Sequence, residues 1–313
     1  MIEKINNAIA TAPKNVSRRQ GAAETESFWG NQPGGMPMFW RKWYIGICVL
    51  GITASLLCSP ARGQDQQELG FHFSLDGQFR YGNISGFVQI PRGGGAGTTS
   101  NERPKFDELG INQAAIGAPS LTLGWNNHNL YGGASIIRLS GSNTLSDTLI
   151  SNGTTFPAGT SVSADIQLDW YRFGYEYRFT YNYSQASAVS FYPAIGVALL
   201  NFDYKLNGVA GLSAARSFEK AAPQLGLATE WNPEGRFSLS GGVFSSLAFS
   251  TLPLLLSVDL TGGYQLWGTP DHGGIAYLGI GYDLIDEEDN QKVSNHIKAS
   301  IGPEVVVGLR LRF

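Results

Sequence analysis

The sequence is short of cysteine, histidine, charge and long apolar runs. Its two cysteines, Cys48 and Cys58, lie in one apolar segment near the N-terminus, and four histidines occur among 313 residues. Charged residues make up 15%, which is low for a soluble protein, and the mean hydropathy is close to zero. These shortages argue against a disulfide scaffold, a thiolate metal site and a bundle of transmembrane helices.

Glycine and aromatic residues are plentiful instead. The chain holds 40 Gly, 17 Phe, 13 Tyr and 7 Trp. Low charge and many aromatic residues at near-zero hydropathy are typical of a barrel with an apolar exterior and a polar interior. A secreted soluble β-sandwich is the alternative interpretation of this composition.

The composition divides the chain into three parts. Residues 1–40 are polar and lack periodicity, so we interpret them as a disordered leader or an over-long gene start. Residues 41–63 have the basic start, short apolar run and small terminal residues of a signal peptide. Residues 64–313 are then the mature domain. Seven of the 22 Lys+Arg and three of the 25 Asp+Glu precede it, which leaves a net charge of about −7 and argues against nucleic acid as a partner.

The cleavage site is predicted from small residues after the apolar run. Ala61 and Gly63 form a small-x-small pattern, so we expect cleavage before Gln64. The run is short for a spanning helix, which needs about 20 residues, although an uncleaved anchor is an alternative. A lipoprotein site at Cys58 is a second alternative, but Leu57 occupies the place where such signals carry a small residue.

The mature part alternates between apolar and polar residues, as strands with one apolar face do. In residues 69–81, for example, Phe71, Phe73 and Leu75 alternate with His72 and Ser74. Short turns and longer polar connections separate the strands in near-regular alternation, which is the pattern of a membrane barrel. The pattern predicts ten strands, and one mistaken split or merge would make them eight or twelve. The predicted ranges are 69–81, 109–125, 130–140, 162–181, 186–204, 218–231, 236–248, 252–267, 274–285 and 296–313.

The last nine residues carry the clearest alternation and end on an aromatic residue. The residues on one face are Val305, Val307, Leu309, Leu311 and Phe313. This ending resembles the C-terminal strand of bacterial outer-membrane β-barrel proteins, and with the signal peptide and the hairpin rhythm the resemblance covers about residues 64–313. It implies an all-β, up-and-down transmembrane barrel in the cell outer membrane of a Gram-negative bacterium. It also implies contact with outer-membrane lipid, insertion by the barrel-assembly machinery and a monomeric state.

Charged residues on the opposite face are predicted to point into the lumen. They are Asp76, Arg80, Arg138, Asp165, Asp169, Arg172, Glu176, Arg178, Glu230, Asp259, Arg310 and Arg312. Asp165 and Asp169 belong to this set only if a bulge at Trp170/Tyr171 changes which face of the strand is apolar. In a narrow barrel such charges pair across the lumen, because an isolated buried charge loses its hydration. They form either a packed polar core or the lining of an ion-selective pore.

No arrangement of residues predicts an enzyme. A hydrolase needs a nucleophile beside a base, or carboxylates beside a histidine. The nearest approach is His296 beyond the acidic run 286–289, at the outer rim. Outer-membrane proteases of the omptin type also place acidic residues and a histidine there, so a barrel hydrolase acting on lipid or peptide is the alternative function. We expect no catalytic residues, no metal and no cofactor, and a passive role as a narrow channel or a structural or surface-interaction barrel.

Overall fold

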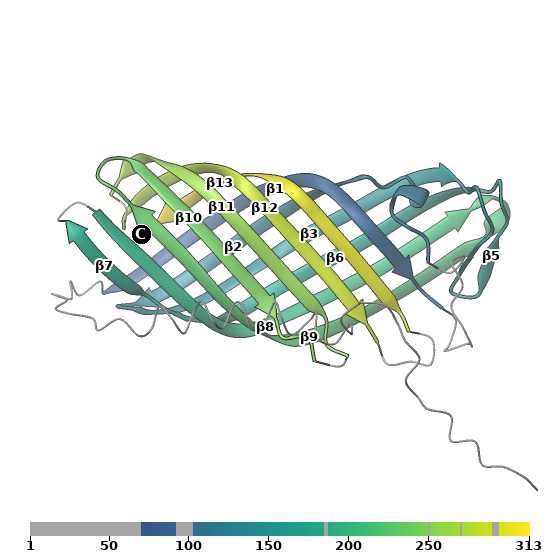
Figure 1. Ribbon diagram of the computed structural model, residues 1–313, viewed down its shortest axis with the longest axis horizontal. Coiled ribbons are helices and arrows are strands. Elements are labelled where there is room, and N and C mark those ends of the chain that lie inside the picture. The colour runs from purple at the N-terminus through teal and green to yellow at the C-terminus, as the bar shows by residue number, and fades with distance from the viewer. Residues whose placement is uncertain (1–69, 92–102, 185–186, 250, 270, 290–293) are drawn as a thin grey trace, which may run out of the picture. The chain divides into compact units, whose positions relative to one another are not determined.

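The computed structural model describes residues 70–91, 103–184, 187–249, 251–269, 271–289 and 294–313. The predicted cleavage site at Ala61, Gly63 and Gln64 lies outside these residues. Ten long antiparallel strands form one barrel (Figure 1). They are β1 (Phe71–Gln89), β2 (Gln113–Trp125), β3 (His128–Thr144), β6 (Ser161–Tyr177), β8 (Ser187–Gly208), β9 (Ser213–Asn232), β10 (Phe237–Ser246), β11 (Leu254–Gly268), β12 (Gly273–Glu288) and β13 (His296–Arg312).

The barrel closes through the pairing of its first and last strands, which are distant in sequence. Consecutive strands pair side by side, β1 pairs with β13, and β6 pairs with β8. Each of the ten strands therefore has a neighbour on both sides, which removes the free edges of an open sheet. The predicted ten-stranded antiparallel barrel is confirmed. No helix among the described residues is long and apolar enough to cross a membrane.

The two ends of the barrel differ. At one end, which we call the turn end, short turns join β2 to β3, β9 to β10 and β11 to β12, and β13 also finishes there (Figure 1). The strand β7 (Phe179–Ser184) continues β6 beyond this end and pairs with β8. At the opposite end, the loop end, lie the turns η2 (Asp107–Leu109) and η3 (Val209–Gly211) and the small hairpin of β4 (Leu149–Ser151) and β5 (Thr154–Phe156).

The half of the barrel next to the turn end, the turn half, is apolar outside and polar inside. On β1 the exposed outward side chains run from Phe71 through Leu75 and Phe79 to Tyr81, while Asp76 points inward and is buried. This stretch has the length that a tilted strand needs to cross a bilayer, about 9–11 residues. We call the outward apolar surface of the turn half the apolar band.

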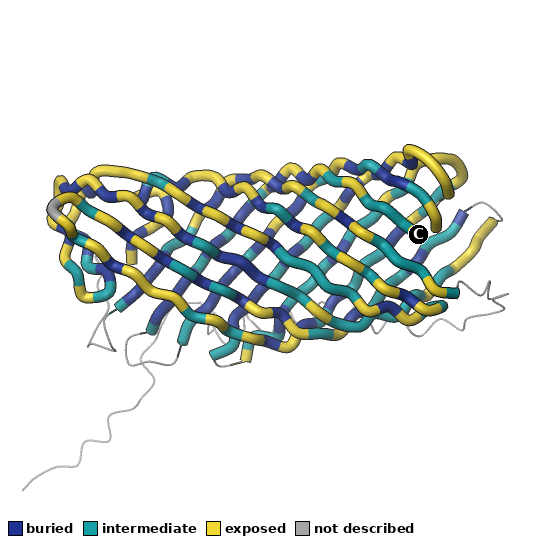
Figure 2. Tube along the Cα trace, turned by 180° about the vertical axis from the view of Figure 1, so that it is seen from behind, coloured by how far each residue is buried: buried dark blue, intermediate teal, exposed yellow. Residues whose placement is uncertain are grey.

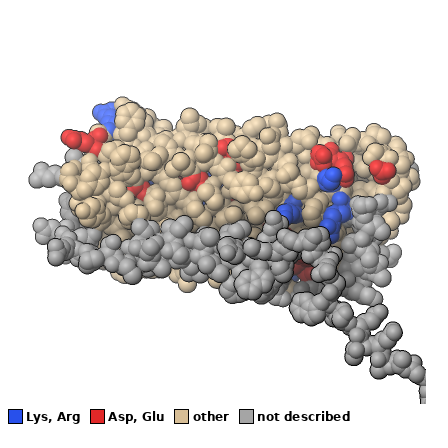
Figure 3. All heavy atoms as spheres, in the orientation of Figure 1, with Lys and Arg blue, Asp and Glu red and all other residues tan. Residues whose placement is uncertain are grey.

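The half next to the loop end, the loop half, reverses this pattern. Farther along β1 the outward residues are Asn83 and Ser85, and the inward residues are Ile84 and Val88. Figure 2 shows the alternation of buried and exposed positions continuing along the strands. On the face drawn in Figure 3, the largest group of charged side chains lies toward the loop end. Beyond the apolar band the wall therefore has a polar exterior, as a barrel in water does.

The loop half is filled by one apolar core. All but one of the ten barrel strands contribute to it, together with Phe106 and Leu109 near η2 and Phe156 of β5. Its largest buried side chains include Trp170, Tyr204, Phe202, Leu168 and Leu200. Burying this much apolar surface stabilises the loop half by roughly 1.5–3 kcal/mol for each large side chain.

The structure overturns the predicted bulge in β6. The register of β6 against β3 and β8 shows no shift at Trp170. Ile166, Leu168 and Trp170 therefore keep one orientation, which is inward, and they belong to the apolar core. The prediction assumed that apolar residues face lipid, but at this level of the barrel they face each other.

Three charged residues consequently lie on the outer face and not in the lumen. Asp165 is exposed on the outer side of β6, Arg138 is exposed on β3, and Asp169 is buried in the wall beside Arg138. Asp169 pairs with Arg138 and accepts a hydrogen bond from the Ile137 amide at 3.0 Å. Assigning these three residues to the lumen was wrong, because at this level the apolar residues that alternate with them face inward into the core: Ile137, Leu139, Ile166 and Leu168.

Candidate functional site

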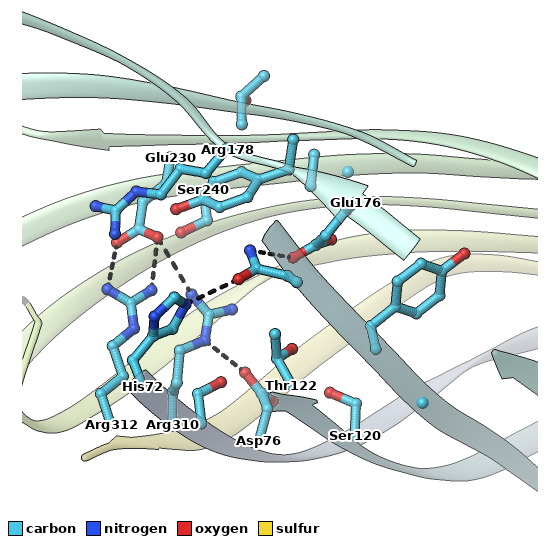
Figure 4. Close-up of a pocket in the computed structure, with 18 of the residues that line it drawn as sticks. His72, Asp76, Ser120, Thr122, Glu176, Arg178, Glu230, Ser240, Arg310 and Arg312 are labelled. Carbon is cyan, nitrogen blue, oxygen red and sulfur yellow. Dashed lines mark hydrogen bonds and ion pairs between the residues drawn. The ribbon is translucent and has the colours of Figure 1, made fainter. Parts of the chain in front are cut away.

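The other nine predicted lumen charges do lie in the interior. Arg80 is buried in the middle of the barrel, and the other eight line a cavity in the turn half. Figure 4 shows part of this cavity, with side chains from several strands converging on it. The eight residues are Asp76, Arg172, Glu176, Arg178, Glu230, Asp259, Arg310 and Arg312.

Ion pairs from β13 link it to β1 and β9. Nε of Arg310 donates to Oδ2 of Asp76 at 2.7 Å. The two terminal nitrogens of Arg312 donate to the two carboxylate oxygens of Glu230 at 2.9 and 2.6 Å (Figure 4). Tyr277 of β12 also donates to Asp76. A planar guanidinium that meets a carboxylate with two parallel bonds is a strong and directional pair, so this network fixes the closing strand.

A second group surrounds Arg80 deeper in the barrel. Its terminal nitrogens lie 3.4 Å from Asp283, 3.6 Å from Glu304 and 3.7 Å from Asp259. Gln78 accepts two more bonds from the same guanidinium, at 3.0 and 2.8 Å. Arg80, Asp283 and Glu304 are each only 1% exposed, so this group blocks the middle of the lumen.

Sequence reasoning missed Asp283 and Glu304. Glu304 directly precedes Val305, so extending the terminal alternation by one residue would have placed it inward. Asp283 likewise alternates with Ile280 and Tyr282, which are exposed on the outer face. The signal was present for both, but both strands shift register close to these residues, at Gly281/Asp283 against β13 and at Gly82/Ile84 against β1.

Arg172 differs from the other lumen arginines. Its guanidinium lies over the ring of Phe244 on β10, 4.8 Å from the ring centre, and 5.9 Å from that of Trp170. Such stacking holds an arginine without using its hydrogen-bond donors. Among the described residues no carboxylate pairs with it. Arg172 and Phe244 thus form a layer between the polar cavity and the apolar core.

The cavity has a volume of about 210 Å³ and reaches the turn end. Asp271 and His272, in the turn between β11 and β12, line one part of it, and Phe244 and Asp259 line another. None of the apolar-core residues lines it. The cavity is therefore a blind polar pocket that stops where the apolar core begins. No group of three His, Cys, Asp or Glu side chains within the described ranges is arranged to hold a metal ion.

The acidic rim does not offer an exposed catalytic histidine. His296 is 5% exposed, and its ring meets Phe87 edge-on at 4.8 Å. Its Nε2 lies 3.0 Å from Asp286 and its Nδ1 lies 3.9 Å from Glu288. His296 therefore makes structural contacts to its neighbours and presents no exposed ring nitrogen to the rim. The described residues of the rim give no support to the hydrolase alternative.

Glu287 is a buried acid on the inner face of the same rim. Its outward neighbours Asp286 and Glu288 lie six or more residues beyond exposed Ile280, so this level is outside the apolar band. Burial raises the pKa of the Glu287 carboxyl to about 7, and Lys220, 3.9 Å away, opposes the shift. The carboxyl therefore gains a proton close to neutral pH.

Comparisons with known proteins agree with this architecture only at a distance. No protein-family model matches the sequence, and no curated protein matches it. Similar solved structures include the attachment invasion locus protein Ail of Yersinia pestis (11% identity, TM-score 0.36, 78% of this chain and 99% of that one). The outer membrane protease OmpT of Escherichia coli has 11% identity and a TM-score of 0.36, over 81% and 99% of the two chains. The outer membrane protein OprG of Pseudomonas aeruginosa has 10% identity and a TM-score of 0.34, over 80% of this chain and 99% of that one.

These likenesses are too distant to carry an inference about activity. The barrel itself defines the class. A closed antiparallel barrel of ten strands, with an apolar band outside and charges inside, satisfies every backbone group of a strand that crosses lipid. The chain thus has the architecture of a transmembrane β-barrel protein of the outer-membrane type.

Proposed function

We propose that this protein is a non-conducting outer-membrane barrel with a structural or surface-interaction role. The observation that carries the proposal is the apolar core of the loop half. A path for ions or polar solutes needs water or polar groups along its whole length, since a desolvated ion costs many kcal/mol. Trp170, Leu200 and Phe202 are 0–2% exposed and fill the lumen where such a path would run.

The size of the barrel supports the same conclusion. Eight strands enclose a lumen that side chains can fill, while open porins have about 16. A ten-stranded barrel is close in width to the eight-stranded barrel, whose lumen side chains can fill. The Arg80 group and the Arg172–Phe244 layer lie between the polar cavity and the core, so three successive layers oppose passage.

The loop half then has a different task from conduction. It carries its own core and a polar exterior, so it folds as a stable platform beyond the apolar band. Such a platform holds η2, η3 and the β4–β5 hairpin in position, which suits contact with molecules outside the cell.

The partners follow from the same features. Lipid covers the apolar band, and the barrel-assembly machinery recognises the strand that ends at Phe313. We expect a monomer, since none of the ten described barrel strands has a free edge for pairing with a second copy.

Solute flux into proteoliposomes tests the proposal. We expect the natural protein to admit neither potassium nor a small sugar. A triple variant, Trp170→Ala, Leu200→Ala and Phe202→Ala, empties the core and should admit potassium. The matched control changes outward residues of the same level, Asn201→Ala and Asp203→Ala, and should stay closed. Rapid flux through the natural protein would reject the proposal.

A further inference from the structure

The charges that line the turn-half cavity leave one residue of each sign without an ion pair. Arg310 and Arg312 pair with Asp76 and Glu230, as described above. Arg178 pairs with Asp271 at 3.4 Å, and Asp259 pairs with Arg80. Within the described part of the chain, Arg172 and Glu176 make no ion pair within 4.0 Å, with each other or with any other residue.

The Arg172 guanidinium has free space around it and is held in position, but no described group accepts a hydrogen bond from it. Gly133 of β3 is its register partner, and a Cβ at that position would lie 3.2 Å from Nε of Arg172. The glycine therefore leaves space for the guanidinium, and Phe244 supports it from one side. A guanidinium carries five N–H donors in a planar fork. No described protein group accepts a hydrogen bond from this fork.

Glu176 is oriented by a neutral group. It accepts a hydrogen bond from the Asn129 amide at 3.2 Å, and Oδ1 of Asn129 lies 2.8 Å from Nε2 of His72 (Figure 4). These bonds orient the carboxylate but bring no opposite charge into direct contact with it. Glu176 lies four residues nearer the turn end than Arg172 on the inward face of β6, which separates their Cα atoms by roughly 13 Å.

We propose that this cavity binds a small zwitterion that enters from the turn end. Its carboxylate pairs with the fork of Arg172, and its protonated amine pairs with Glu176. A simple anion would pair with Arg172 and leave Glu176 without an ion pair. A simple cation would pair with Glu176 and leave Arg172 without one. The volume of about 210 Å³ limits the ligand to a few heavy atoms beyond the two charged groups. The ligand enters and leaves at the turn end without crossing the barrel, so this site does not depend on whether the lumen is closed to ions.

Calorimetric titration of the folded protein in a non-ionic detergent tests the proposal. The probes are glycine, 4-aminobutyrate and 6-aminohexanoate, which place the two charges progressively farther apart. Butyrate and butylamine carry one charge each. We expect saturable binding of at least one amino acid of the series, at least tenfold tighter than either single-charge probe. Tenfold corresponds to about 1.4 kcal/mol.

Matched variants locate the binding. Arg172→Gln and Glu176→Gln should each weaken that amino acid at least tenfold. Arg236→Gln, at an exposed turn, should leave its affinity unchanged. A gel shift between heated and unheated samples reports folding of each variant. If Arg172→Gln does not fold, Arg172→Lys keeps the charge without the fork and should bind more weakly than the natural protein.

Three results would overturn the proposal. One is the absence of saturable binding for the whole series. Another is equal binding of butyrate and 4-aminobutyrate with a loss only in Arg172→Gln, which would define a plain anion site. The last is unchanged affinity in both Gln variants, which would place the ligand elsewhere. Each of these leaves the flux test of the proposed function unaffected.

Discussion

Phe313 and Phe73 exchange both of their backbone hydrogen bonds. The Phe313 amide donates to the Phe73 carbonyl at 2.8 Å, the Phe73 amide donates to the Phe313 carbonyl at 3.0 Å, and the two rings lie 5.7 Å apart. The last residue of the chain is thereby bonded to the first strand at the seam of the barrel. In the same row Val305, Val307 and Leu309 are 41–56% exposed on the outer face.

The first prediction concerns this seam. Deleting Phe313, or changing Leu311→Asp, should prevent closure and leave the protein unfolded outside the membrane, because the terminal row then lacks an apolar residue. The measurement is the fraction of heat-modifiable barrel in outer-membrane preparations. Ser300→Asp, on the outward face of the same strand but in the loop half, is the control and should assemble. A normal yield from the Phe313 deletion would show that the seam residue is dispensable.

The second prediction concerns the ion pairs of the closing strand. Arg310→Ala should lower the free energy of unfolding by about 3 kcal/mol, because it leaves the buried Asp76 carboxylate without its positively charged partner. Lys205→Ala removes an exposed pair with Asp203 and should cost less than about 1 kcal/mol. Urea unfolding in lipid vesicles measures both. A smaller loss for Arg310→Ala than for Lys205→Ala would contradict a stabilising role of the network.

The third prediction concerns the apolar core. Phe202 is fully buried, with Phe218 at 4.9 Å and Tyr204 at 6.4 Å between ring centres. Phe202→Ala should destabilise the barrel by about 3–5 kcal/mol, through lost burial and the cavity left behind. Its outward neighbour Asp203→Ala should change stability by less than about 1 kcal/mol. Equal, small effects in urea unfolding would mean that the loop half is loosely packed.

The fourth prediction is a pH dependence in the loop half. The pKa of Glu287 is about 7 in the folded state and close to 4.5 when the chain is unfolded, so the folded state binds the extra proton. Stability linked to this group is therefore full below about pH 4.5 and is lost as the pH rises through 7. Amide exchange of the loop half should speed up between pH 5 and 8, after correction for the intrinsic rate. Glu287→Gln should remove that increase, whereas Glu219→Gln, on the outer face of β9, should keep it.

The sequence predicted the wall of the barrel well and its interior less well. The alternation in 69–81 and 305–313 identified strands and their lipid side, because in the turn half one face must meet lipid. The alternation through Ile166, Leu168 and Trp170 was equally clear, but periodicity tells only that one face is apolar and not which side of the wall that face is on. The apolar core of the loop half was for that reason not predicted.

Pairing inside the lumen was also beyond the sequence. The alternation of inward and outward residues placed Arg172 and Arg310 in the interior, and both were expected to form ion pairs across the lumen. Arg310 meets Asp76 on β1, while Arg172 crosses toward β10, where Phe244 lies. Which partner each arginine meets depends on the stagger of strands far apart in sequence, and a single sequence does not encode that in any short pattern.

Single-channel recording of the purified natural protein in a planar bilayer tests directly whether the lumen is closed. We expect at most small and infrequent current steps, because the Arg80 group and the apolar core close the lumen. Large, steady and ion-selective conductance would contradict it, and would make Arg80, Arg172 and Arg310 the lining of a pore.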